Sequence, residues 1–334
     1  MIDINLYFIP IPSCLHTSGY NRTMIFDGYT REMKFIPNIL NQITERHKNW
    51  QIKEILNYYP AEYYDTILEY LDYLNENRII YLGNKNETKL FADFNTEWDF
   101  PALILNAIIE IKNLTRLDYF QLIDQLDRLL CFYLQINFLK PLSNQDISKL
   151  IEYAHSKSFR SINLTIDNQS FNQEEIENFI KGNPKINKVK IYSAEKDEFI
   201  KFEELISYIQ FTELDYNSFF CSKKISPNMF SLRIEHFTES QLHNTCLNRK
   251  ICIDSEGNIK NCPNMSQSYG NIKDTTLAEA IEKQGFKDCW TICKDKIDVC
   301  KDCEFRHICT DCRAFIKDPG NIYSQPAKCG YNPY

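Results

Sequence analysis

The sequence predicts an α/β protein in three parts: a winged-helix-like domain over residues 1–85, a central parallel βα sheet or partial (β/α) barrel over residues 95–240, and a cysteine-rich domain over residues 241–334. Three observations lead to this prediction. A hairpin pattern precedes three helices with one apolar face, strand-like and helix-like segments then alternate, and ten of the thirteen cysteines lie from Cys246 onward. A chain of 334 residues can bury two or three separate cores.

Composition narrows the class of protein. With 43% hydrophobic and 25% charged residues and only 9 glycines, the chain is expected to be soluble and globular. A formal charge of −7 argues against nucleic acid or an anionic membrane as a partner. No basic, apolar leader opens the chain and no run of about 18 apolar residues occurs, so we expect neither export nor membrane insertion and place the protein in the cytoplasm. Thirteen cysteines are then hard to interpret as disulfides, and their clustering indicates metal.

The N-terminal part combines short strands with three helices. Asn5–Ile9 is strand-like, and Thr23–Asp27 and Glu32–Ile36 flank a turn and predict a hairpin. Pro37 then opens a helix, because proline is tolerated at the first helical position. Two more helices with one apolar face follow, and then a short strand over Arg78–Leu82. A hairpin, three helices and a strand make a winged-helix pattern.

This order of elements resembles the peptide-recognition element of enzymes that mature ribosomally made, modified peptides. The resemblance implies that a precursor leader peptide adds a strand beside the hairpin while its side chains enter apolar pockets. The candidate peptide-binding residues are Thr23, Ile25, Phe26, Met33 and Phe35. Two alternatives stay open. The domain could be an accessory unit without a ligand, or it could bind DNA as many winged helices do, which the acidic net charge disfavours.

The central part alternates strands and helices. The expected strands are Leu103–Ile111, Phe132–Ile136, Ser161–Ile166 and Lys188–Tyr192, and the expected helices are Tyr119–Leu130, Asn144–His155 and Gln173–Ile180. Repeated βα units predict a largely parallel sheet, either open or closed into a partial barrel. No glycine-rich phosphate loop is present, so the common nucleotide sites are not indicated.

Eight cysteines of the C-terminal part follow a regular spacing. Their order is Cys246-x5-Cys252-x9-Cys262, then Cys300-x2-Cys303-x5-Cys309-x2-Cys312, then x16 to Cys329. Eight thiols make two sets of four, and four thiolates suit either tetrahedral zinc or an iron–sulfur cluster. Coordination chemistry alone leaves these two metals open.

The residues around these cysteines have expected roles of their own. Gly257 and Asn258 predict a hairpin turn between Cys252 and Cys262 that brings both sulfurs to one side. Further cysteines and histidines of this part are not expected to bind metal. Cys289 and Cys293 should pack near the metal sites, and His243 and His307 should lie at the surface.

The spacing resembles the SPASM domain, the C-terminal extension of radical SAM enzymes that modify peptides and proteins. Cys246, the Gly257-x4-Cys262 segment, the Cys300–Cys312 run and Cys329 reproduce its seven-cysteine order, and Cys252 supplies an eighth. The resemblance implies two [4Fe-4S] clusters. It implies Cys246, Cys252, Cys262 and Cys312 as ligands of the first and Cys300, Cys303, Cys309 and Cys329 as ligands of the second. The chain departs from the family in having two residues, not three, between Cys309 and Cys312.

A radical SAM enzyme also needs a CxxxCxxC loop after its first barrel strand, because a cluster with one free iron must bind and reduce S-adenosylmethionine (SAM). Leu103–Ile111 resembles that strand, but residues 112–118 contain no cysteine. Cys289 and Cys293 have the spacing of the first pair but lack a third thiol two residues on. We therefore expect no SAM cofactor and no radical SAM catalysis, and residues 95–240 resemble a degenerate radical SAM partial barrel.

A narrower resemblance extends over the whole chain. The segments Ile9–Cys14, Arg22–Asp27, Phe35–Pro37, Cys303–Cys309 and Cys329–Pro333 resemble the SPASM-domain maturases of grasp-with-spasm gene cassettes. That family is encoded beside a precursor peptide and an ATP-grasp ligase that forms ester or amide crosslinks. The resemblance implies peptide maturation of the graspetide type, without naming the step.

Three hypotheses of function follow. In the first, the chain is a non-radical iron–sulfur partner that binds the precursor leader and acts with the ATP-grasp ligase. In the second, it is a redox enzyme that uses a cluster with an open coordination site on the peptide, and the departure near Cys312 is where such a site would arise. In the third, it is a zinc-bound regulator that binds DNA through the winged helix.

Overall fold

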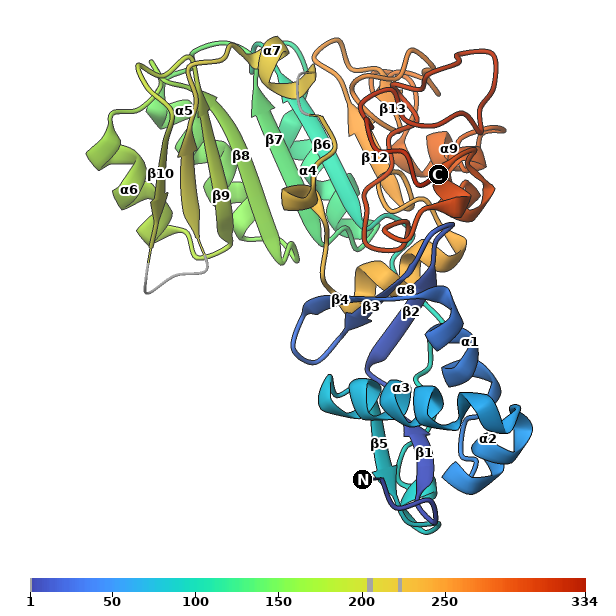
Figure 1. The fold of residues 1–334 in the computed structure, drawn as a ribbon. Coiled ribbons are helices and arrows are strands. Elements are labelled where there is room, and N and C mark those ends of the chain that lie inside the picture. Colours follow the sequence, from blue (N-terminus) through green and yellow to red (C-terminus); the bar gives the residue numbers. More distant parts are fainter. Residues whose placement is uncertain (1, 203–206, 222–223) are drawn as a thin grey trace.

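The computed structural model describes residues 2–202, 207–221 and 224–334 (Figure 1). Its N-terminal domain contains two small antiparallel sheets and three helices. The elements are β1 (Tyr7–Pro10), β2 (Cys14–Ser18), β3 (Thr23–Asp27), β4 (Glu32–Ile36), α1 (Asn38–Arg46), α2 (Ile52–Tyr58), α3 (Tyr64–Glu76) and β5 (Ile80–Gly83). Strand β1 pairs with β5, and β3 lies between β2 and β4 in a three-stranded sheet. The predicted hairpin and the three helices are confirmed, whereas β2 was not predicted.

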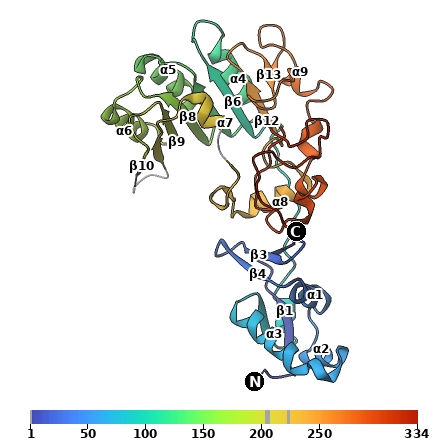
Figure 2. The same ribbon diagram turned by 45° about the horizontal axis from the view of Figure 1, so that its top comes forward.

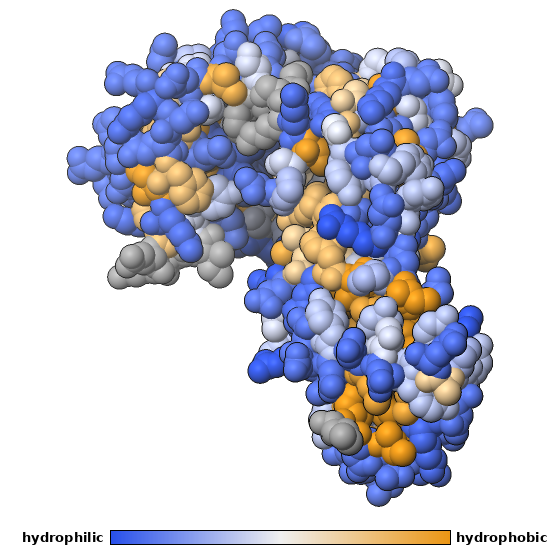
Figure 3. Space-filling view, in the orientation of Figure 1, coloured by the Kyte–Doolittle hydropathy of each residue, from blue (hydrophilic) through white to orange (hydrophobic). Residues whose placement is uncertain are grey.

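Both faces of the three-stranded sheet are covered by other parts of the chain. Side chains alternate along β3, so successive residues pack on opposite faces of the sheet. Ile25 packs with α1, α2 and α3 in one apolar core. Met24 and Phe26 point to the opposite face and pack with Phe237 and Ile308, far along the sequence. Figure 3 shows apolar side chains gathered where the N-terminal domain meets the rest of the molecule. The N-terminal domain is therefore joined to the C-terminal part through a shared core.

The centre of the molecule is an eight-stranded sheet in the order β10-β11-β9-β8-β7-β6-β12-β13. Its strands are β6 (Asn106–Ile111), β7 (Tyr133–Phe138), β8 (Ser161–Asp167), β9 (Ile186–Tyr192), β10 (Glu198–Lys201), β11 (Tyr208–Phe211), β12 (Lys250–Ile253) and β13 (Ile259–Lys260). Neighbours are parallel except for the outermost pairs, β10–β11 and β12–β13. The two outermost strands do not pair with each other, so the sheet is open. The predicted βα repeats are confirmed. The sequence left open whether the sheet would be open or closed into a partial barrel, and the structure shows an open sheet.

Helices cover one face of this sheet. They are α4 (Tyr119–Arg128), α5 (Asn144–His155) and α6 (Gln173–Gly182), and their apolar residues share one core with the inward side chains of β6 to β9. The other face is polar. Glu110, Asn137, Thr165 and Lys190 lie side by side in register across β6, β7, β8 and β9. The short helix α7 (Tyr216–Cys221) lies over this polar face (Figure 1).

The cysteine-rich part is continuous with the sheet. Helix α8 (Ile234–Leu242) leads into β12 and β13, which extend the sheet beside β6, and α9 (Leu277–Ile281) packs into the same core. The remaining chain is irregular apart from short 3-10 helices at Asp288–Thr291, Lys294–Lys296 and Cys300–Asp302. In Figure 2, α8 and the C-terminal end lie next to β3. Among the helices of the described residues, none has the length and apolarity that crossing a bilayer requires.

Candidate metal centres

The first set of thiols is assembled around the β12–β13 hairpin. Cys252 is fully buried on β12 opposite Lys260, and Cys262 follows β13. The turn between the strands needs Gly257, which has a φ of +89° and whose added Cβ would lie 2.9 Å from Asn271 Oδ1. Asp254 fixes the turn, because its carboxylate accepts hydrogen bonds from the backbone of Glu256 and Asn258. The hairpin thus holds two cysteines on one side of the sheet's edge.

Electrostatic interactions show which thiols neighbour these two. Burial raises the pKa of the Cys262 thiol, and the nearby Cys246 and Cys312 raise it further. Burial likewise raises the pKa of Cys252, to which Glu110 and Cys262 add. The pKa of Cys312 is raised by burial and by Cys246. Cys246, Cys252, Cys262 and Cys312 are therefore linked by these electrostatic interactions.

Within the second set of thiols, burial and neighbouring cysteines also raise pKa values. Burial raises the pKa of Cys300 to about 11, with Cys309 and Cys329 among the neighbours that raise it further. Burial raises the pKa of Cys303 to about 12, with contributions from Cys309 and Cys300. The pKa of Cys309 is also raised by burial and by Cys329. Cys300, Cys303, Cys309 and Cys329 are therefore linked by these electrostatic interactions.

The donor atoms of both sets are thiols, a ligand type that iron–sulfur clusters take. Within the described ranges, no three Cys, His, Asp or Glu side chains stand at the spacing that one metal ion requires. A four-iron cluster binds each thiolate to a different iron, so its ligands stand farther apart than those of one zinc ion. Four soft thiolates in each set are the number and type of donor that such a cluster takes.

Each set also contains a lysine that sequence reasoning missed. Lys250 Nζ lies 3.6 Å from Cys246 Sγ. Burial lowers the pKa of Lys250, but Cys246 and Cys262 outweigh burial and the pKa is raised overall. Lys294 is 5% exposed, and Cys309 and Cys300 likewise raise its pKa against the effect of burial. Both lysines lie within two residues of a cysteine in the sequence, which is the only signal that could have indicated them.

The other candidate ligands lie nearby but make different contacts. Cys289 and Cys293 are 8% and 4% exposed, and Cys289 packs with Leu247 and Ile297 in a small core that also contacts Cys246 and Cys262. The expectation that His307 lies at the surface is wrong. It is 5% exposed, held between Thr17 and Asp295 at 3.3 and 3.1 Å, because the N-terminal sheet covers it. His243 is partly buried and stacks edge-on against Trp98.

A pocket lies beside the first set, at the carboxyl ends of β6 and β7. Its volume is about 360 Å³, and Glu110, Lys112, Lys140, Tyr216 and Pro263 are among its lining residues. Burial raises the pKa of Glu110, which accepts a hydrogen bond of 2.7 Å from the hydroxyl of Tyr216. Lys112 directly follows β6 and begins a loop without cysteine over residues 112–118. The pocket thus places polar groups next to Cys262 but no thiol of that loop.

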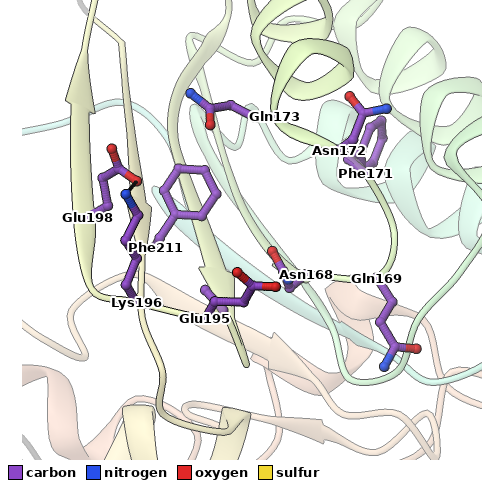
Figure 4. Close-up of a pocket in the computed structure, with 10 residues that line it drawn as sticks. Asn168, Gln169, Phe171, Asn172, Gln173, Glu195, Lys196, Glu198 and Phe211 are labelled. Carbon is purple, nitrogen blue, oxygen red and sulfur yellow. Dashed lines mark ion pairs between the residues drawn. The ribbon is translucent and has the colours of Figure 1, made fainter.

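A second pocket lies farther along the same edge of the sheet. Figure 4 shows it at the ends of β8 and β9, with four amide side chains and two phenylalanines around a volume of about 430 Å³. Asn172 is engaged in capping α6, and Lys196 pairs with Glu198 at 3.0 Å. The amide of Gln173 also contacts Glu177. Lys196 and Glu198 therefore pair within the pocket lining, whereas the partners of Asn172 and Gln173 belong to α6 and do not line the pocket.

The predicted peptide-binding residues divide into two groups. Thr23, Ile25 and Phe26 lie on the middle strand and are at most 1% exposed, so a peptide cannot reach their side chains. Met33 and Phe35 lie on β4, an edge strand, and are partly exposed. The sequence showed the hairpin but not β2, and it is β2 that makes β3 the middle strand.

Comparisons with known proteins add little to this geometry. No protein-family model matches the chain, and no curated protein matches its sequence. Among solved structures, the chain is similar to Streptococcus suis SuiB bound to S-adenosylmethionine, with 14% identity and a TM-score of 0.35. SuiB alone and SuiB bound to precursor peptide SuiA give 13% and 12% identity, each with a TM-score of 0.34. All three matches cover 97% of this chain and 100% of SuiB. At these TM-scores the similarity assigns no function to this chain.

Proposed function

We propose that this chain is an iron–sulfur protein that holds two [4Fe-4S] clusters and takes part in the maturation of a ribosomal peptide. The observation that supports it best is the division of eight thiols into two neighbouring sets, each with one lysine among the sulfurs. The first cluster would bind Cys246, Cys252, Cys262 and Cys312, and the second would bind Cys300, Cys303, Cys309 and Cys329.

The chain's own residues would hold and shield these clusters. When bound, a cluster supplies a one-electron redox centre and a cross-link between distant segments. The β12–β13 hairpin positions two ligands of the first cluster, and the N-terminal sheet covers the loop that carries Cys303 and Cys309 of the second. With all eight thiolates engaged and no cysteine in residues 112–118, we propose that the protein has no SAM cofactor and does no radical SAM chemistry.

The proposed partners are a precursor leader peptide and an ATP-grasp ligase. The leader would add a strand to β4, where Met33 and Phe35 are partly exposed. Lys34 of β4 donates a hydrogen bond to the carbonyl of Asn77, just after α3, so this edge borders that helix. The ligase is proposed from the family resemblance of the segments at both ends of the chain. In this role the protein presents the peptide to the ligase.

Metal analysis of anaerobically purified protein tests the cluster proposal. We expect about eight iron atoms and about eight acid-labile sulfides per chain, with absorbance near 400 nm, because each four-iron cluster uses four thiolates. About two zinc ions without sulfide would contradict the proposal and favour the zinc-bound regulator.

Binding of a leader peptide to the full-length protein tests the recognition proposal. Ordering a disordered peptide costs free energy, so we expect a dissociation constant on the order of micromolar. Met33→Asp and Phe35→Ala should each weaken binding several-fold. Phe199→Ala is the matched control, because Phe199 is 60% exposed on β10 of the other sheet. Equal binding by all variants would exclude β4 as the docking edge and leave the pocket beside β2 as the candidate.

A further inference from the structure

The two lysines among the thiols have few acidic partners. Lys250 is partly buried, and its ammonium group contacts Cys246 Sγ at 3.6 Å. Glu239 is close enough for an electrostatic interaction with Lys250, but no ion pair joins Lys250 to a carboxylate in the described part of the chain. By contrast Lys260, on the facing strand of the same hairpin, pairs with Asp254 at 2.9 Å. A lysine removed from water without a carboxylate partner is costly unless another anion neutralises it.

Around Lys294, too, buried positive charges outnumber buried negative charges. Its ammonium group lies 3.9 Å from Asp311, but that carboxylate also accepts a hydrogen bond of 2.7 Å from Arg313. All three side chains are at most 6% exposed. Two cations and one anion leave one positive charge in this buried group. The thiols that interact electrostatically with Lys294 belong to Cys309, Cys300 and Cys329.

A cluster held by four thiolates supplies the missing negative charge. Such a cluster is an anion, and accepting an electron makes it more negative. A buried cation beside it therefore stabilises the reduced form more than the oxidised form and raises the reduction potential. We propose that Lys250 and Lys294 are dedicated electrostatic partners of the first and second clusters, each retaining its own cluster and raising that cluster's reduction potential. This inference rests on the proposed iron–sulfur function.

Substitution of each lysine in the full-length protein tests the inference. Lys250→Met and Lys294→Met remove the charge and keep much of the side-chain length, and Lys294→Gln keeps hydrogen-bonding capacity if the methionine variant fails to fold. Lys260→Met and Lys296→Met are the matched controls, because Lys260 has its own carboxylate and Lys296 is exposed two residues from Lys294. Iron content and the midpoint potential of each cluster are measured by redox titration followed by electron paramagnetic resonance.

We expect each lysine variant to lower the midpoint potential of one cluster, or to halve the iron content, while leaving the other cluster unchanged. Lys250→Arg should keep wild-type potentials. The titration is repeated in Cys303→Ala protein, where only the first cluster should remain and only Lys250→Met should shift it. Potentials and iron content equal to wild type in both lysine variants, or identical shifts in the two controls, would overturn the inference. Wild-type protein without iron and sulfide would instead show that the proposed function has failed.

Discussion

Arg22 Nε donates a hydrogen bond of 2.8 Å to Glu304 Oε1 and thereby joins the turn between β2 and β3 to the loop that carries Cys303 and Cys309. The Glu304 side chain is 3% exposed and also accepts a hydrogen bond of 2.8 Å from the hydroxyl of Tyr331. Arg306 reaches back from the same loop and donates to the carbonyl of Ser18 at 2.7 Å. The N-terminal sheet and the second thiol set are thus held by polar contacts as well as by a shared core.

Removing Arg22 should destabilise the protein. Arg22→Ala leaves the buried Glu304 carboxylate with Tyr331 as its remaining partner, and an under-satisfied buried group costs about 1–3 kcal/mol, here toward the lower end because Arg22 is 44% exposed. Urea unfolding measures the change. The control is Lys287→Ala, which breaks an exposed pair with Glu282 and should cost less than about 1 kcal/mol. Equal costs for the two variants would contradict the role given to Arg22.

The two thiol sets should load independently. Cys262→Ala and Cys303→Ala each remove a ligand from a different set, so each should lose about half of the iron while retaining the other cluster. Iron and sulfide analysis of anaerobic protein measures this, with Cys131→Ala as the control. Cys131 is fully buried in the core of the central sheet, away from both sets. Loss of all iron from either variant would mean that the two centres form as one unit.

Much of the fold could be predicted because its signals are local. The hairpin of β3 and β4 has the predicted bounds, and α5 matches its predicted range, since alternation and one-sided apolarity are visible in short windows. Strand β2 was missed because it ends in three polar residues, His16, Thr17 and Ser18. The first two are held by hydrogen bonds to Asn41 and His307 elsewhere in the chain. Local patterns do not report such tertiary partners.

The candidate site likewise contains residues that the sequence could indicate and residues that it could not. Spacing indicated the eight cysteines, but Lys250 and Lys294 could not be predicted, because a lysine in sequence is expected at the surface. Nor could the sequence show that β12 would join the central sheet beside β6, since that pairing connects residues about 140 positions apart. The long-range arrangement that gives these lysines their surroundings is visible only in the folded chain.

Stability should depend on pH through Glu239. Burial raises its pKa to about 7, against a hydrogen bond of 2.8 Å from Asn248 and nearby cations including Lys250. Because the folded-state pKa lies above the unfolded value, the contribution of Glu239 to stability is fully present below about pH 4.5 and is lost as pH rises through about 7. Glu239→Gln should therefore be more stable than wild type above pH 7, by at most about 3 kcal/mol.

Urea unfolding of both proteins at intervals from pH 5 to pH 8 measures this difference. The stability gap between Glu239→Gln and wild type should widen with rising pH. Glu235→Gln is the control for removal of an exposed carboxyl from the same helix, and the widening should be specific to Glu239→Gln. A gap for Glu239→Gln that is also constant would show that this carboxyl titrates near its ordinary pKa.

The last prediction concerns SAM. Reductive cleavage of SAM needs a cluster with one iron free of thiolate, and in this chain the loop after β6, residues 112–118, supplies no cysteine. The eight proposed ligands are divided between two sets of four, and both remaining cysteines of the C-terminal part, Cys289 and Cys293, are buried. We therefore expect no 5′-deoxyadenosine from dithionite-reduced protein and SAM, with or without peptide, as measured by liquid chromatography.

The matched variant for this experiment is the double substitution Cys289→Ala and Cys293→Ala. It should keep about eight iron atoms, because neither thiol is a proposed ligand, and it should be as inactive toward SAM as wild type. Sustained deoxyadenosine formation by repurified wild-type protein would contradict the prediction. Loss of that activity in the double variant would then identify the pair as ligands of a third cluster, whereas its persistence would mean that one of the two proposed clusters has an open iron, with Cys312 as the first thiolate to substitute.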